Sequence, residues 1–381
     1  MSQTDPHGGD PVERYRDQIG RARSDVRTPA LLLDLDRAKR NIAAMAERFA
    51  SMPAKLRPHI KVHKCVALSR MQVDAGAVGV ACATAWEVAV MARGGIADVL
   101  LANQVVSPEK IAALIGAAQL GTRVTGTVDD PRHLDALSEA AASAGVTLEY
   151  LIEVDVGMGR CGVRDRDAAL RLAQYGSGKP GIALRGLQGY EGHCMLEPDT
   201  DVRVKAAQEA NEKLIDVADH LGAHGFACTD LSAGGTGTYY ITGANPRITE
   251  VQAGSYALMD AFHGNLVPGG FEVALSVAGT VISRQGNTVI LDCGRKSVGI
   301  DLVTPPLLGD SEGVVRSYAE EHALIDYPGT PPVDLGDVVE VMPGYGPSTV
   351  NLHDAFLVVE DGVVTDVWPV HPRGPGRAWL G

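Results

Sequence analysis

The feature that most constrains the fold of this 381-residue chain is a repeated alternation of short apolar runs with segments of helical periodicity. The first apolar run, residues 28–36, is followed by Ile42, Met45 and Phe49, which recur at helical spacing. Such units, each about 20 to 30 residues long, continue to residue 232 and predict a parallel sheet. About eight of them would close a (β/α)8 barrel of the TIM type, which takes roughly 250 residues.

The expected elements alternate along the chain without interruption. Strands are predicted at residues 28–36, 57–63, 78–82, 99–102, 123–128, 148–154, 184–190 and 230–232. Helices are predicted at residues 36–51, 65–75, 85–94, 108–116, 131–144, 165–175 and 202–221. A doubly wound sheet is the alternative architecture, but no GxGxxG sequence opens a helix after the first strand.

From about residue 274 the pattern changes to short strands separated by Gly, Pro and Asp turns, without a convincing helix. This change predicts a separate C-terminal all-β domain in an α/β protein. We therefore expect a polar leader at 1–27 with a short helix near 12–19, a barrel at 28–273 and the β domain at 274–381.

Composition narrows the class of partner. The formal net charge of −13 argues against nucleic acid and against an anionic membrane surface. The six cysteines form no CxxC pair, so neither a zinc knuckle nor a disulfide framework is indicated. The polar N-terminus has no apolar core of the kind a secretory signal requires. We expect a cytoplasmic protein that acts on small molecules.

Lys61 is the first candidate for chemistry. It lies in the basic segment 56–64 between His59 and His63, and the alternation with Ile60 and Val62 predicts a strand with the three basic side chains on one face. A lysine among cationic or proton-accepting groups has a lowered pKa, which a Schiff-base amine needs. The alternative is a basic surface strand that leads into a turn.

Two further strand ends carry polar groups, and in a barrel the carboxyl ends of the strands hold the functional side chains. In the segment 153–163, three glycines flank Arg160 and let the backbone approach a ligand closely. In the segment 187–193, Tyr190 can stack on a flat ring and His193 can act as an acid or a base. A glycine-rich turn with a solvated arginine, and a structural histidine, are the alternatives.

Two glycine-rich loops indicate a phosphate site. The segments 232–238 and 249–256 present backbone N–H groups and hydroxyls, which are the usual ligands of a bound anion. The expected ligands are Gly235, Thr236, Gly237, Gly254, Ser255 and Tyr256. A phosphate loop and a Schiff-base lysine on one barrel together suggest pyridoxal phosphate.

These motifs resemble those of the D-threonine aldolase and D-serine dehydratase family, pyridoxal-phosphate enzymes of fold type III with the alanine-racemase-like fold. The matching segments are 28–36, 57–64, 156–163, 234–238, 252–256, 291–294 and 336–343. The resemblance implies a barrel that carries the cofactor, a C-terminal β domain and a homodimer. It also implies that Lys61 forms the Schiff base, that Arg160 lies near the phenolic oxygen of the cofactor, and that the two glycine loops bind its phosphate.

The sequence departs from this family at one position that matters. Members commonly carry Pro-x-His-x-Cys or Pro-x-His-x-Asp, whose His and Cys or Asp bind a divalent metal. Here the stretch that begins at Pro343 has Tyr345 and Pro347 at those places, and neither is a good ligand. We expect no divalent metal at this site. A shifted site at His353 and Asp354 is the alternative, although adjacent strand residues face opposite sides.

The resemblance favours a lyase that cleaves or forms a β-hydroxy-D-α-amino acid, as a D-threonine aldolase does. In place of the metal, Tyr345 is expected to assist once nearby cations lower the pKa of its phenol, and His193 is the other candidate for the critical proton. The alternatives are a racemase or epimerase in which Lys61 and Tyr345 act from opposite faces, a D-serine or 3-hydroxyaspartate dehydratase, and a non-catalytic protein that binds pyridoxal phosphate.

Overall fold

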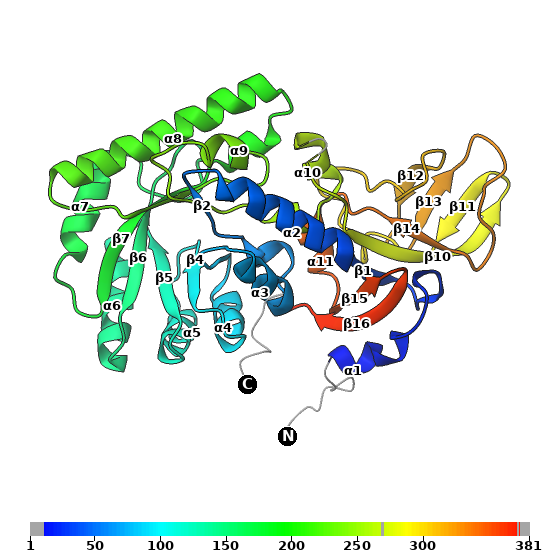
Figure 1. Cartoon of the computed structure of the whole chain (residues 1–381), viewed down its shortest axis with the longest axis horizontal. Helices are drawn as coiled ribbons and strands as arrows, with labels where there is room; N and C mark the ends of the chain where they lie inside the picture. The colour runs from blue at the N-terminus through cyan, green and yellow to red at the C-terminus, as the bar shows by residue number, and fades with distance from the viewer. Residues whose placement is uncertain (1–10, 268–269, 372, 374–381) are drawn as a thin grey trace. The chain divides into compact units, whose positions relative to one another are not determined.

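Eight parallel strands form one sheet in the computed structural model, which describes residues 11–267, 270–371 and 373 (Figure 1). The strands follow the order β2-β9-β8-β7-β6-β5-β4-β3. They are β2 (Lys55–Leu56), β3 (Val80–Cys82), β4 (Asp98–Leu101), β5 (Arg123–Val128), β6 (Leu148–Glu153), β7 (Ile182–Gly189), β8 (Asp230–Ala233) and β9 (Glu250–Val251). A parallel bridge between His59 and Ala81 joins the two ends of this order, and the Ala81 N–H donates to the Pro58 carbonyl at 2.8 Å. The barrel prediction is therefore confirmed.

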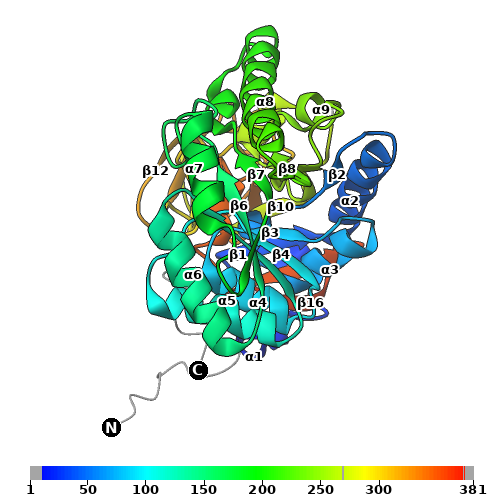
Figure 2. The ribbon, with the colours of Figure 1, turned by 90° about the vertical axis from the view of Figure 1, so that its left-hand side faces the viewer.

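Helices alternate with these strands and cover the outer face of the sheet, as α6 and α7 do in Figure 2. They are α3 (Val66–Asp74), α4 (Ala85–Arg93), α5 (Pro108–Gln119), α6 (Pro131–Ala144), α7 (Arg166–Gly176), α8 (Thr200–Ala223) and α9 (Tyr239–Thr242). Local sequence signals set several of their ends. The Asp130 carboxylate caps the first turn of α6, Pro131 occupies its first position, and Gly145 ends it in the left-handed region at φ 66°.

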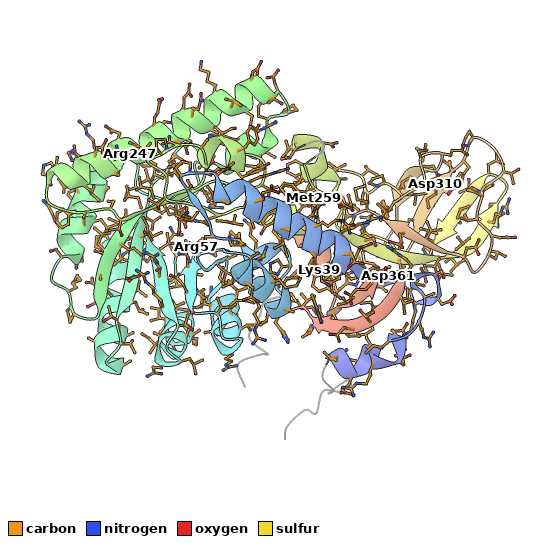
Figure 3. The ribbon with its side chains drawn as sticks, viewed as in Figure 1. Lys39, Arg57, Arg247, Met259, Asp310 and Asp361 are labelled. Carbon is orange, nitrogen blue, oxygen red and sulfur yellow. The ribbon has the colours of Figure 1, made fainter. Side chains whose placement is uncertain are left out.

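The interior of the sheet contains a buried ion cluster. Arg57, which Figure 3 labels, is 1% exposed. Its Nε lies 2.7 Å from Glu250 Oε2, and its Nη1 lies 2.7 Å from Asp98 Oδ1. Burial disfavours the charged guanidinium, but the two carboxylates outweigh burial and raise the pKa of Arg57. The cluster joins β2, β4 and β9, because Arg57 follows the last residue of β2 while Asp98 and Glu250 are the first residues of β4 and β9.

A second sheet gathers strands from both ends of the chain in the order β12-β13-β11-β10-β1-β15-β16, with β14 paired to β10. Its strands are β1 (Ala30–Asp34), β10 (Leu275–Gln285), β11 (Thr288–Leu291), β12 (Val314–Tyr318), β13 (Ala323–Asp326), β14 (Val338–Val341), β15 (Ala355–Glu360) and β16 (Val363–Pro369). Strand β1 pairs antiparallel with β10 and parallel with β15. The strand expected at residues 28–36 to open the barrel therefore belongs to the second sheet.

The chain accordingly folds into two compact units. Within the described residues, the barrel unit comprises 42–61 and 66–256, and the second unit comprises 11–41, 62–65 and 257–373. The division between the two units falls within the helix α2 (Leu35–Ala50), after residue 41. At the start of the described chain, α1 (Pro11–Tyr15) and the 3-10 turn Arg16–Gln18 confirm the short helix predicted near 12–19. The second unit also contains the short helices α10 (Ala261–Leu266) and α11 (Gly346–Val350). Helix α11 lies beyond residue 274, in the region that was expected to have no helix.

In the described part of the chain, no helix is both long and apolar enough to cross a bilayer.

Candidate active site

Lys61 does not lie on a strand. Strand β2 ends at Leu56, Pro58 has no N–H to extend a ladder, and Ile60–Val62 forms a 3-10 turn. The expectation that His59, Lys61 and His63 share one strand face is therefore wrong. Instead, His59 is 8% exposed and its Nδ1 lies 3.4 Å from the Lys61 backbone N–H, so His59 supports the turn that carries Lys61.

The amine of Lys61 is nevertheless unusual, as predicted. Burial, the larger cause, and the cation of Arg160 together lower the pKa of Lys61 to about 8, although the carboxylate of Glu87 opposes them. At neutral pH an appreciable fraction of this amine is therefore unprotonated, and only the unprotonated form attacks a carbonyl.

Tyr190 brings the two predicted cations together. The Lys61 Nζ lies 5.5 Å from the centroid of the Tyr190 ring, and the Arg160 Cζ lies 5.7 Å from the same centroid. Tyr190 follows the end of β7, while Arg160 comes from the loop after β6. The carboxyl ends of the parallel strands meet at one edge of the barrel, which is why Lys61 and Arg160, 99 positions apart in sequence, share one ring.

The segment 232–238, here called the glycine-threonine loop, is held by Glu191, a residue that the sequence patterns did not single out. Glu191 is fully buried, and its Oε2 accepts a hydrogen bond from the Gly234 N–H at 2.9 Å. Its Oε1 accepts from the Thr238 and Thr242 hydroxyls at 2.8 and 2.7 Å. The signal was a glutamate directly after an apolar strand, in Tyr190-Glu191-Gly192, but a sequence gives no sign that this carboxylate turns inward.

The two predicted phosphate loops meet. The Tyr256 backbone N–H donates to the Thr236 hydroxyl at 3.2 Å, and both residues are buried. The Tyr256 hydroxyl accepts from the Gln72 amide at 2.9 Å, so its ring is fixed from the other end. Ser255 and Tyr256 lie on a 3-10 turn that follows Gly254, and they bring backbone N–H groups beside the loop that contains Gly235, Thr236 and Gly237.

The lining of these loops fits pyridoxal phosphate. A Cβ added at Gly235 would lie 3.3 Å from Met195 Cε and 3.4 Å from Tyr190 Cε2, so the glycine lets this backbone lie close to the aromatic ring without displacing either side chain. The His193 Nδ1 is buried and has no hydrogen-bond partner among the described residues. Buried N–H groups, an aromatic face and a lysine of lowered pKa match an anionic, flat, carbonyl-bearing cofactor.

Arg160 is anchored by a second residue that the sequence analysis did not single out. Glu153 ends β6, is 4% exposed, and its Oε1 lies 3.6 Å from Arg160 Nη2. The other oxygen accepts from the Gln104 amide at 2.7 Å. Burial raises the pKa of Glu153, although both partners oppose the shift.

In the second unit, Tyr345 immediately precedes α11 and lies beside a buried aspartate–histidine pair. Asp260 Oδ1 accepts from the His263 backbone N–H and lies 2.8 Å from His263 Nδ1, while Oδ2 accepts from the Gly346 N–H at 2.7 Å. The His263 and Tyr345 rings are stacked, with 5.9 Å between their centroids. Burial, together with Asp260 and Asp301, raises the pKa of Tyr345. The sequence predicted that nearby cations would lower the pKa of Tyr345. That prediction is wrong, because the charged groups that act on Tyr345 are the carboxylates of Asp260 and Asp301.

The alternative metal pair is engaged otherwise. The His353 Nε2 lies 2.8 Å from the Ser297 carbonyl oxygen, and Asp354 pairs with Arg14 and Arg373. Among the residues that the structure describes, no group of three or more His, Cys, Asp or Glu side chains could hold a metal ion.

Comparison with known proteins gives a consistent set of relatives. Residues 33–261 match the family model for the alanine racemase N-terminal domain, and residues 274–359 match that for a putative serine dehydratase domain. A D-threonine aldolase of Arthrobacter sp. is 36% identical over 97% of this chain and 96% of its own. A 3-hydroxy-D-aspartate aldolase of Paracoccus denitrificans (strain Pd 1222) is 34% identical over 94% of this chain and 95% of its own. The crystal structure of D-threonine aldolase from Filomicrobium marinum superposes with a TM-score of 0.89 at 35% identity, and covers 92% of this chain and 97% of its own.

Proposed function

Because the chain belongs to the pyridoxal-phosphate-dependent family of the alanine racemase N-terminal domain, we propose that it is a pyridoxal-phosphate lyase that cleaves or forms β-hydroxy-D-α-amino acids. The observation that carries the proposal is the similarity to two such aldolases over nearly the whole chain, so that it covers both the barrel unit and the second unit.

The barrel unit supplies the groups for the cofactor. Lys61 would hold the cofactor covalently, and Tyr190 would pack against its ring. The loops at 234–238 and 254–256 would bind its phosphate through backbone N–H groups and hydroxyls, and Arg160 would donate to its phenolic oxygen. When bound, the cofactor withdraws electrons from Cα of the amino acid, so that a bond to Cα breaks more easily.

Cleavage between Cα and Cβ also requires that the β-hydroxyl loses its proton. Within the barrel unit His193 is the group suited to accept it, because its buried Nδ1 has no partner among the described residues. Tyr345 has a raised pKa, so its phenol is protonated at neutral pH and is suited to donate a hydrogen bond. A racemase that uses Tyr345 as a base is disfavoured by the same shift.

We also infer that the reaction needs no divalent metal, because the positions of the usual ligands are held by Tyr345 and Pro347. Activity should survive treatment with EDTA. Complete loss with EDTA, restored by a divalent ion, would show that other residues bind a metal. We also propose that the protein is a cytoplasmic homodimer. The mass of the purified protein in solution tests whether it is a dimer.

The decisive experiment is incubation of the chelator-treated protein with D- and L-threonine, serine, phenylserine and alanine, followed by chiral chromatography. Glycine and an aldehyde from a D-β-hydroxy acid support the aldolase. Interconversion of enantiomers without cleavage supports the racemase, and formation of a keto acid with ammonia supports the dehydratase. A protein that binds the cofactor and converts none of these amino acids would contradict the proposal.

A further inference from the structure

We propose that Glu153, together with Gln104, is a positioning residue that keeps the Arg160 guanidinium over the Tyr190 ring and beside Lys61. This inference rests on the proposed function only in assigning Lys61 and Arg160 to the cofactor, and the contacts that carry it all lie within the barrel unit.

The first step is the geometry at Glu153. Its carboxylate is almost completely buried at the carboxyl end of β6, yet each oxygen has its own partner: Gln104 Nε2 at 2.7 Å and Arg160 Nη2 at 3.6 Å. A buried carboxylate is costly unless it is paired. Gln104 has no charge, so Arg160 supplies the compensating positive charge.

The second step is that the backbone of the Arg160 loop is fixed independently of Glu153's side chain. The Asp155 N–H donates to the Val163 carbonyl at 3.0 Å, and the Gly162 N–H donates to Asp129 Oδ2 at 2.7 Å. Gly162 has φ 107°, and an added Cβ would lie 2.6 Å from the Asp155 backbone nitrogen, so a glycine is required there. The loop can therefore keep its path when the carboxylate is changed.

The third step concerns the Arg160 side chain, which is 47% exposed at the tip of this loop. A half-exposed arginine loses side-chain rotamer entropy when it is held in one place, so it stays there only if contacts offset that loss. Glu153 approaches it from the buried side and Tyr190 offers a ring face to the same guanidinium. Without the carboxylate, the guanidinium is free to turn toward water.

The consequence reaches Lys61 through Arg160. The Arg160 cation contributes to the lowered pKa of Lys61, whereas Glu153 makes no direct contribution to that shift. If Glu153 acts by holding Arg160, then removing either residue should raise the pKa of Lys61, and removing both should raise it no further. A purely structural role of Glu153 would produce no such dependence.

The test uses Glu153→Gln, Arg160→Gln and the double variant, each prepared without cofactor. The pKa of Lys61 is measured by NMR titration of isotope-labelled lysine side chains, with its signal assigned from Lys61→Arg. The affinity for pyridoxal phosphate is measured by fluorescence. We expect both single variants to raise the pKa of Lys61 and to weaken cofactor binding by about 10- to 100-fold, the range for loss of one hydrogen bond to a charged group. The double variant should match Arg160→Gln.

The matched control is Glu149→Gln on the same strand. Glu149 also pairs with an arginine, since its Oε2 lies 2.7 Å from Arg123 Nε, but it makes no contact with Arg160. This variant should leave the pKa of Lys61 and the cofactor affinity unchanged. Circular dichroism of all variants checks the fold, and if Glu153→Gln unfolds, Gln104→Ala takes its place.

The proposal is overturned if Glu153→Gln leaves the pKa of Lys61 at its original value while Arg160→Gln raises it, or if the effects of the single variants add in the double variant. These readouts do not depend on turnover. A protein that shows the expected coupling but cleaves no β-hydroxy-D-amino acid would contradict the proposed reaction and leave the role of Glu153 standing.

Discussion

The pKa of Lys61 predicts how the protein captures its cofactor as pH changes. With a pKa of about 8, about one amine in ten is unprotonated at pH 7 and about half are unprotonated at pH 8. A lysine with the ordinary value of 10.5 would have about one unprotonated amine in three thousand at pH 7. The rate of covalent capture should therefore rise about ninefold from pH 6 to 7, about fivefold from pH 7 to 8, and less than twofold above pH 8.

The assay mixes cofactor-free protein with pyridoxal phosphate in rapid-mixing experiments and follows the visible absorbance of the covalent product. Lys61→Ala is the control, and it should give no product that borohydride can reduce. The reasoning is refuted if the rate keeps rising about tenfold per pH unit to pH 10, because that course belongs to a solvated lysine. It is equally refuted if Lys61→Ala still captures the cofactor covalently.

Three further changes test the rest of the site and its support. Arg57→Met should lower the free energy of unfolding by about 3–5 kcal/mol in urea titrations, because Glu250 is left buried and unpaired. The additional change Glu250→Gln should recover more than half of this loss. No recovery would contradict this account. Glu191→Ala should weaken cofactor binding by about 10- to 100-fold in fluorescence titrations, since two donors of the glycine-threonine loop and the Thr242 hydroxyl of α9 lose their acceptor. Unchanged affinity would exclude the loop from the site. Tyr345→Phe should lower kcat by about 100-fold or more with little change in KM, whereas a rise in KM alone would make Tyr345 a binding residue only.

The alternation in the sequence predicted most of the barrel because each of its elements has a local cause. The strand at 123–128 and the helix at 131–144 have the predicted bounds, since Asp130, Pro131 and Gly145 mark the helix ends. Strand β1 shows where this approach fails. Its residues 30–33 are buried on both faces, and such a run suits a barrel strand as well as a central strand of the second sheet. Its neighbours, β10 and β15, lie more than 200 residues away in sequence.

The sequence predicted those residues of the candidate site whose type and neighbours indicate a chemical role. It did not predict the residues that act by holding another residue in place. Lys61, Tyr190 and Arg160 are distinctive in sequence, and the structure brings them together at one ring. Glu153 ends an apolar strand and Glu191 closely follows one, and a glutamate at such a place is most simply interpreted as the first solvated residue of a loop. Only the fold shows that both carboxylates turn inward and hold the loops that carry the recognisable residues.

The division of the chain separates two properties that are usually measured together. Every residue proposed to hold the cofactor belongs to the barrel unit, whereas Tyr345 belongs to the second unit, where Asp260 and His263 fix its loop. Variants at Lys61, Arg160 or Glu191 should therefore change the binding of the cofactor, and turnover should fall as a consequence. Variants at Tyr345 should change turnover while cofactor affinity stays the same. If Tyr345→Phe instead released the cofactor, Tyr345 would belong to the cofactor site, and its substitution for a metal ligand would need a different explanation.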